Sequence, residues 1–264
     1  MKKYVVAAML VTLGLAGCAT TETYDETRGW TVEKLYAEAR DELNSGNYTR
    51  AVKLYETLEA RYPYGRFAQQ AQMDLAYTHY KDNEPELAVA AADRFIKLHP
   101  AHPNIDYIYY LKGLVYFNDD SGMLAKWAGQ DMSERDPKAA RESFLAFREL
   151  TTRFPDSKYA VDAREKMEKL VNALGGNEMH VARYYMKRGA YLAAANRAQG
   201  VLKDYANTRY PEEALAITIT AYDKLGMTQL RDDSKRVLQL NYPKSHYLQQ
   251  PWAVEEMPWW RFWK

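Results

Sequence analysis

The feature that most constrains how this chain can fold is an internal repeat, whose copies lie 37 residues apart in two of the four intervals. One copy shows the template: a turn at Gly46–Tyr48, a small residue at Ala51, an apolar residue at Leu58, and an aromatic residue followed by Pro at Tyr62–Pro63. The position of Ala51 recurs, with one charged exception, at Ala88, Ser143, Ala194 and Arg231. A fixed period of this length indicates an array of stacked units, each of which buries its apolar face only against its neighbours.

Each copy of the repeat has the spacing of a helix pair. Apolar residues such as Ala51, Tyr55 and Leu58 recur at three or four positions, which places them on one helical face. The closing Pro lacks a backbone donor and disfavours helix at the residue before it, so the chain must turn there. The first helix of each unit keeps a small residue where its partner helix comes close, at Ala39, Ala76, Gly113 and Ala182.

No segment alternates regularly as a strand would, so we predict an all-α, tetratricopeptide-like solenoid of about five helix pairs. The arrangement resembles the tetratricopeptide repeat, whose period is 34, stretched by about three residues. A generic bundle of unrelated amphipathic helix pairs is the alternative. A continuous helical stretch is expected from Tyr159 to Lys187.

The predicted segments follow the repeat boundaries. They are a signal peptide (1–17), a lipidated flexible tether (18–30), repeats 1–2 (31–103), repeat 3 with a loop insertion (104–157), repeats 4–5 (158–248), and a Trp-rich extension (249–264). The insertion from Asn118 to Arg135 carries Trp127 with several methionines, and it is expected either to contact a partner or to fold over the array.

The N-terminus has the pattern of a secretory signal. Lys2 and Lys3 precede an apolar run from Tyr4 to Leu15, which is too short to cross a bilayer because a spanning helix needs about 20 residues. The sequence Leu-Ala-Gly-Cys that ends at Cys18 resembles the lipobox of bacterial lipoproteins. That resemblance implies a lipid anchor on Cys18, and Ala19 in place of Asp implies the outer membrane, on its periplasmic face.

Composition and motifs argue against several classes of function. Lys and Arg number 36 against 35 Asp and Glu, so there is no basic excess for nucleic-acid binding. The five histidines form no metal-binding helix pattern, and no glycine-rich phosphate loop is present, so we expect no metal and no cofactor. The pair Glu142 and Ser143 faintly resembles helical lytic transglycosylases, but Ser143 already fills the small position of repeat 3. We therefore expect a binding protein and not an enzyme.

Tyrosine and arginine mark the candidate binding surfaces. The chain has 22 Tyr, which combine rigid contact area with a hydroxyl and suit a groove for peptides. The proposed groove residues include Tyr62, Tyr64, Tyr77 and Tyr80, with Arg66 as a donor for a carboxylate or carbonyl. Around the turn of repeat 4, Arg188, Asn196 and Arg197 are candidates to hold a partner's carboxylate through paired hydrogen bonds.

Several runs together resemble one family along nearly the whole mature chain, the BamD/ComL family of outer-membrane assembly lipoproteins. They are Tyr62–Gly65, His99–Tyr107 and Arg135–Pro137. The resemblance implies a non-enzymatic scaffold that joins the POTRA domains of a BamA-type subunit, helps hold accessory lipoproteins of the BamC and BamE type, and receives unfolded β-barrel precursors. It further implies that Arg188 and Arg197 meet the last POTRA domain. Tyr62, Tyr64 and Phe67 would meet the precursor's C-terminal strand.

The extension after Pro251 departs from shorter versions of that family. It carries four of the six tryptophans, so it should dock back to cap the last helix pair, meet a partner subunit, or lie among lipid headgroups. A peptidoglycan-associated structural lipoprotein is the alternative function, and a glycan-cleaving enzyme is the remoter one.

Overall fold

A computed structural model describes residues 25–117 and 137–253, and these contain ten α-helices and one short 3₁₀ helix. The helices are α2 (Val32–Asn44), α3 (Tyr48–Arg61), α4 (Arg66–Lys81), α5 (Pro85–Leu98), α6 (Ile105–Tyr116), α8 (Pro137–Arg153), α9 (Ala160–Lys187), α10 (Tyr191–Asp204), α11 (Pro211–Lys224), α12 (Thr228–Asn241) and η2 (His246–Leu248). The described residues contain no strand.

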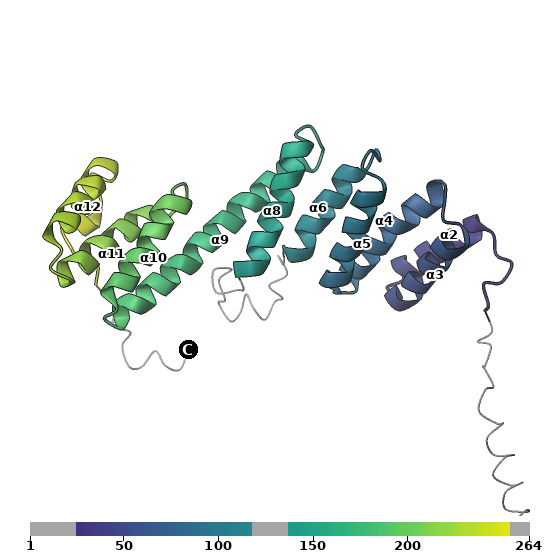
Figure 1. The fold of residues 1–264 in the computed structure, drawn as a ribbon, viewed down its shortest axis with the longest axis horizontal. Helices are drawn as coiled ribbons and strands as arrows, with labels where there is room; N and C mark the ends of the chain where they lie inside the picture. Colours follow the sequence, from purple (N-terminus) through teal and green to yellow (C-terminus); the bar gives the residue numbers. More distant parts are fainter. Residues whose placement is uncertain (1–24, 118–136, 254–264) are drawn as a thin grey trace, which may run out of the picture.

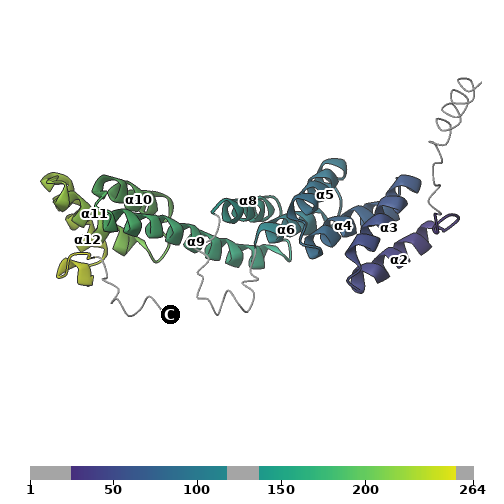
Figure 2. The same ribbon diagram turned by 90° about the horizontal axis from the view of Figure 1, so that it is seen from below.

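The helices form five antiparallel pairs that stack in a row, α2–α3, α4–α5, α6–α8, α9–α10 and α11–α12 (Figure 1). The second helices α5, α8 and α10 lie in one layer, and the first helices α4, α6 and α9 lie in the other (Figure 2). The long helix α9 contacts both α8 and α10, so it joins repeat 3 to repeat 4. The structure therefore confirms the all-α, tetratricopeptide-like solenoid of five helix pairs.

Four of the pairs close on a residue with left-handed backbone at the same place, directly after the first helix. These are Gly46 (φ 81°), Asn83 (φ 59°), Gly189 (φ 72°) and Gly226 (φ 69°). Glycine takes this conformation without a Cβ penalty, and Asn is the side chain that tolerates it best. The turn positions of the sequence repeat are thus the residues directly after the helix C-caps, where the chain reverses.

The small residues of the repeat lie where paired helices touch. Ala39 and Ala51 face each other's helices with no exposed surface, as do their counterparts Ala76 and Ala88 in repeat 2. In repeat 3 the Ser143 hydroxyl donates to the backbone oxygen of Gly113 at 2.8 Å. These positions set the spacing of helices within each pair, so the solenoid depends on them.

The segment that the sequence predicted as a tether is held against the first repeat at its C-terminal end. Arg61 donates to the backbone oxygen of Thr27 at 2.7 Å and pairs with Asp25, while Arg50 pairs with Glu26 at 3.1 Å. Thr27 is buried, and Trp30 packs on the core of α2 and α3. The prediction of a flexible tether over 18–30 is therefore corrected for residues 25–30, since ion pairs and burial fix them. Cys18 lies outside the described residues.

Candidate partner-binding surfaces

The described residues show no clustered chemistry of the kind that metal sites need. Across 25–117 and 137–253, no group of three or more His, Cys, Asp or Glu side chains is placed to hold a metal ion. In the same ranges, no helix has the length and apolar character that crossing a membrane would require. Glu142 is exposed on α8, whereas the neighbouring Ser143 is buried beneath Gly113. The two side chains of the transglycosylase-like pair therefore do not share a cleft.

The predicted groove residues nearest the first repeat lie in and just after the α3–α4 connection. The Tyr62 hydroxyl donates to the backbone oxygen of Trp30 at 3.1 Å, and Tyr64 is 91% exposed. Arg66 begins α4 and lies 4.9 Å above the ring of Phe67, which in turn contacts Tyr36 of α2 at 5.4 Å. Arg66 and Phe67 are thus brought together with the first helix, while Tyr62 fixes the entry into repeat 1.

Tyr36 leads to a network that sequence reasoning missed. Its hydroxyl donates to Oδ2 of Asp74 at 2.8 Å, and Gln70 donates to Oδ1 of the same carboxylate at 2.9 Å. Burial is the largest influence on Asp74 and raises its pKa, although the hydrogen bonds from Tyr36 and Gln70 oppose this. Tyr36 and Asp74 come from the first helices of consecutive repeats, so the bond bridges two repeats.

The same arrangement recurs two repeats further on. Tyr110 of α6 donates to Oδ2 of Asp162 of α9 at 2.5 Å, and its ring stacks on Tyr159 at 4.8 Å. Tyr107 contacts Tyr159 at 5.8 Å, and it packs together with Tyr77 and Tyr80 of repeat 2 against one core cluster. Burial is the largest cause that raises the pKa of Tyr107 and of Tyr110 above the usual range.

These side chains form one continuous surface on the first-helix layer, which we call the tyrosine stripe. Its members are all half-buried and come from α2, α4, α6 and the start of α9; they are Tyr36, Asp74, Tyr77, Tyr80, Tyr107, Tyr110, Tyr159 and Asp162. Tyr77 and Tyr80 lie 6.1 Å apart within it. The spacing of Tyr77 and Tyr80 along α4 was the available sequence signal, but the bonds from Tyr36 to Asp74 and from Tyr110 to Asp162 are tertiary features.

The predicted partner residues Asn196 and Arg197 lie together in repeat 4. Arg197 pairs with Glu178 of α9 at 2.9 Å, and Arg141 of α8 approaches the same carboxylate at 3.9 Å. These side chains, with Gly200, Asp204 and Tyr205, line a cavity of about 310 Å³. The hydrogen bond from Arg197 and the charge of Glu178 raise the pKa of Arg197, which keeps it protonated. An incoming carboxylate would therefore have to share Arg197 with Glu178.

The third predicted partner residue, Arg188, lies at the turn between α9 and α10. It sits 5.8 Å over the ring of Tyr184, which is 51% exposed, and Leu192 beside this turn is 53% exposed. The turn of repeat 5 is also apolar, since Leu225, Met227 and Leu230 are exposed there. Trp127, the remaining candidate, lies outside the described residues.

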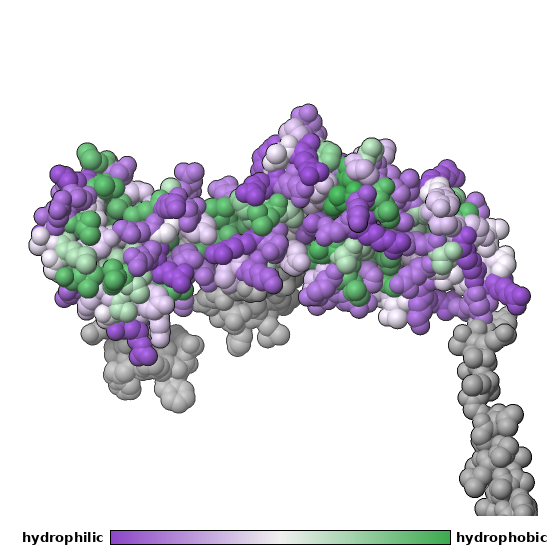
Figure 3. Space-filling view, in the orientation of Figure 1, coloured by the Kyte–Doolittle hydropathy of each residue, from purple (hydrophilic) through white to green (hydrophobic). Residues whose placement is uncertain are grey.

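Apolar side chains also appear on the layer of second helices. Figure 3 shows apolar patches over α5 and over the α11–α12 pair, where Leu87, Val237 and Leu240 are exposed. A long apolar patch on a water-facing surface marks a contact site more often than scattered single residues do. The C-terminal repeats thus present apolar contact area on both their turns and their outer helix.

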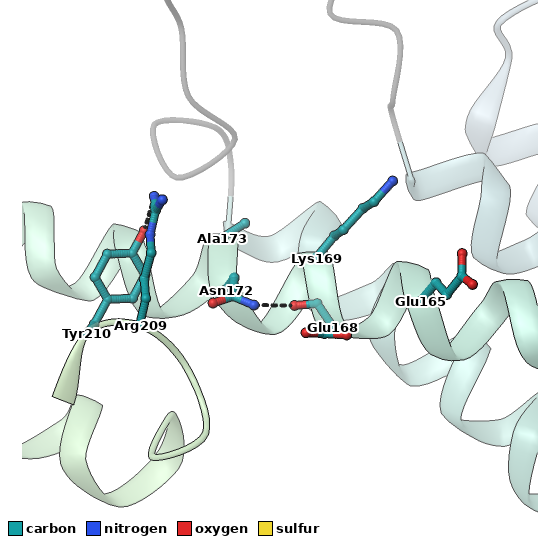
Figure 4. A pocket seen from close by; sticks show the side chains of 7 residues that line it. All are labelled: Glu165, Glu168, Lys169, Asn172, Ala173, Arg209 and Tyr210. Carbon is teal, nitrogen blue, oxygen red and sulfur yellow. Dashed lines mark hydrogen bonds between the residues drawn. The ribbon is translucent and has the colours of Figure 1, made fainter.

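A cavity of about 540 Å³ lies along α9. Figure 4 shows Glu165, Glu168 and Lys169 projecting from α9, with Arg209 beside Tyr210 on the α10–α11 connection. Arg209 donates to the Tyr210 hydroxyl at 2.8 Å. The two cationic and two anionic side chains balance, so the cavity has no net charge to attract a phosphate or a metal ion.

The chain after α12 returns to the fourth and fifth repeats. Nε1 of Trp252 donates to Oε1 of Glu213 at 3.1 Å, and Arg183 holds the same carboxylate through Nε at 2.7 Å and a second nitrogen at 2.5 Å. Burial acts to raise the pKa of Glu213, but the Arg183 hydrogen bonds and charge outweigh it and hold the pKa below the usual value. The docking expected of the extension therefore occurs for Trp252; residues 254–264 lie outside the described residues.

Comparison with known proteins agrees with this arrangement. The chain matches the model of the YfiO family, described as an outer membrane lipoprotein, over residues 29–240. It is 61% identical over 267 residues to the outer membrane protein assembly factor BamD of Neisseria meningitidis serogroup B, with 100% of both chains covered. It is 34% identical to the BamD of Vibrio cholerae, covering 91% of this chain and 99% of that one.

A solved structure of PilW, described as a widely conserved type IV pilus biogenesis factor, matches at 15% identity with a TM-score of 0.35, covering 83% of this chain and 96% of that one. A match that low carries no conclusion about function. The fold and the family model together define the class of protein as a helical-repeat member of the YfiO family, which is described as an outer membrane lipoprotein family. Within that class, the chain belongs to the BamD family of outer membrane protein assembly factors.

Proposed function

We propose that this protein is a lipid-anchored scaffold of the β-barrel assembly machinery, which binds the POTRA region of the barrel-inserting subunit and receives unfolded barrel precursors. Family membership supports the assembly role, and the open row of helix pairs supports a scaffold because it offers long surfaces instead of an enclosed pocket. The proposal includes anchoring through Cys18 on the periplasmic face of the outer membrane, contact with accessory lipoproteins, and no enzymatic step.

The tyrosine stripe is the observation that carries the precursor-binding part of the proposal. Tyr77, Tyr80 and Tyr107 offer ring faces, while Asp74 and Asp162 offer carboxylate oxygens that accept backbone N–H groups. An extended strand presents alternating side chains and free backbone N–H groups, which are the complements of rings and acceptors. The stripe crosses three consecutive repeats and the start of a fourth, so it matches the length of a strand better than a single pocket does.

The fourth repeat is the proposed contact for the POTRA region. Arg197 is held in place by Glu178, and Asn196 adds an amide at the rim of the same cavity. The nearby turn adds Tyr184 and Leu192 as exposed apolar area next to Arg188. An arginine beside exposed aromatic and apolar side chains has the composition of an interface hot spot.

Two binding measurements test the proposal. A fluorescent peptide from a barrel precursor's final strand should lose affinity about tenfold on Tyr77→Ala with Tyr107→Ala, since stacking contacts are each worth about 0.5–1.5 kcal/mol. Tyr184→Ala, an exposed tyrosine outside the stripe, is the matched control and should bind normally. Equal affinity for all three proteins would remove the stripe from the function.

The second measurement is co-purification with the POTRA region. Arg197→Leu should weaken it while helix content stays unchanged. Arg94→Leu, which breaks the 3.2 Å ion pair between α5 and Glu59 of α3, far from repeat 4, should not. Retention of the protein on peptidoglycan without any POTRA contact would instead favour the wall-associated alternative.

A further inference from the structure

The described chain ends beside the fourth helix pair. After η2 it runs back along α11, where Trp252 packs on the core of repeats 4 and 5 and is held by Glu213. The backbone oxygen of Trp252 accepts a long hydrogen bond of 3.5 Å from Thr220, near the C-terminal end of α11. Both views place the end of the described chain next to the α9–α10 turn (Figures 1 and 2). Trp252 thus fixes the point and the direction from which the following residues leave.

That turn is apolar and cationic. Tyr184 and Leu192 are each about half exposed, and they flank the exposed cations Lys187 and Arg188. Arg188 lies over the Tyr184 ring, and the described residues show no carboxylate paired with it. We call this surface, formed by Tyr184, Lys187, Arg188 and Leu192, the repeat-4 tip.

The sequence that follows Trp252 supplies both carboxylates and aromatic rings. Glu255 and Glu256 come first, and the aromatic residues Trp259, Trp260, Phe262 and Trp263 come after them, interleaved with the cations Arg261 and Lys264. The eleven residues 254–264 can reach up to about 36 Å from Ala253, more than twice the length of a ten-residue helix segment. Carboxylates would meet the cations of the tip, and tryptophan rings would cover Tyr184 and Leu192 and stack on Arg188.

We propose that residues 254–264 bind the repeat-4 tip of the same chain. The clamp of Arg183, Glu213 and Trp252 makes this an intramolecular contact with a high effective concentration, so modest affinity is enough to hold it. The exposed side chains of the tip and the hydrogen bonds that hold Trp252 support this contact independently of the proposed function. If the proposed function also holds, this segment covers Arg188 and competes with the barrel-inserting subunit for it.

Disulfide trapping in the full chain tests the contact. Cys18→Ser removes the one native thiol, after which Ala190→Cys at the tip is combined with Arg261→Cys in the extension. Neither replaced residue is one of the aromatic or apolar side chains that form the proposed contact. The control pair joins Arg261→Cys to Lys203→Cys, an exposed position near the other end of α10. We expect the tip pair to form an intramolecular disulfide at least tenfold faster than the control pair.

Substitutions at the repeat-4 tip distinguish binding of the extension to the tip from mere proximity of the two. Tyr184→Ser with Leu192→Ser should slow the tip pair about tenfold, whereas Glu165→Ser, also exposed on α9, should leave its rate unchanged. Equal rates with and without the tip substitutions would overturn the proposal, because the extension would then only pass close by. Disulfides between two chains in place of one would also overturn it, since a second copy would be the occupant.

Discussion

The hydroxyl of Tyr36, in the first helix of repeat 1, donates a 2.8 Å hydrogen bond to the carboxylate of Asp74, in the first helix of repeat 2. Tyr110 and Asp162 repeat this relationship between α6 and α9. In a solenoid each repeat contacts only its neighbours, so a polar bond of this kind ties the stacking of repeats to the layout of the binding surface. Changes at the stripe are therefore expected to affect stability as well as binding.

Tyr36→Phe should lower the free energy of unfolding by about 1.5 kcal/mol. A hydrogen bond to a charged group contributes about 1.5–3 kcal/mol, and partial exposure of Tyr36 places it at the low end. Urea denaturation followed by circular dichroism measures the change. Tyr77→Phe is the control, since the described residues show no hydrogen bond from its hydroxyl, and a loss as large as that of Tyr36→Phe would contradict the assignment.

The Glu213 clamp predicts a pH-dependent stability. The pKa of Glu213 is lowered in the folded protein, so its contribution is fully present above the unfolded value near 4.5 and is lost as pH falls through the folded pKa. Glu213→Gln should destabilise the protein by about 2 kcal/mol at pH 7 and by much less at pH 3. Thermal unfolding at both pH values decides this, and an equal deficit at both would show that the carboxylate charge is not involved.

Gly113 lies so close to α8 that there is no room for a side chain, and Gly113→Ala should be destabilising. A Cβ there would overlap the ring of Phe147, which is fully buried in α8. Overpacking of this kind costs about 1–3 kcal/mol. Gly200→Ala in α10 is the opposite case, because a Cβ there meets nothing within 4 Å, and it should add about 0.5–1 kcal/mol. Comparison of the two melting temperatures against the parent protein tests both signs.

The bonds of Arg61 should determine how stably residues 25–30 are held against α3. Arg61→Ala removes the bonds to Thr27 and Asp25, so chymotrypsin should cleave after Trp30 about tenfold faster in the native protein, which corresponds to about 1.4 kcal/mol of lost local stability. Arg94→Ala serves as the control. An unchanged cleavage rate would mean that burial of Thr27 holds this segment without the arginine.

The fold could be predicted from the sequence because its determinants are local and periodic. Chain reversals are indicated by residue types that tolerate left-handed backbone, at Gly46, Asn83, Gly189 and Gly226. Helix ends are indicated by the closing Pro residues. Small residues such as Ala39 and Ala76 mark the close contacts between paired helices. Each of these signals lies within one repeat and depends only on residues close together in the sequence.

Contacts between repeats were settled only by the tertiary structure. In the sequence, Asp74 and Asp162 cannot be distinguished from other surface charges. Only the stacking of repeats brings a tyrosine hydroxyl of the preceding repeat within hydrogen-bonding distance of each carboxylate. The same holds for Arg61, whose bonds to Asp25 and Thr27 join the end of α3 to the segment that precedes α2.

Sequence by itself thus determined the number, kind and order of the helix pairs, since backbone propensity and apolar period act over a few residues. Which side chains share a surface depends on the superhelical path of the stack, and that path follows from packing summed over all the repeats.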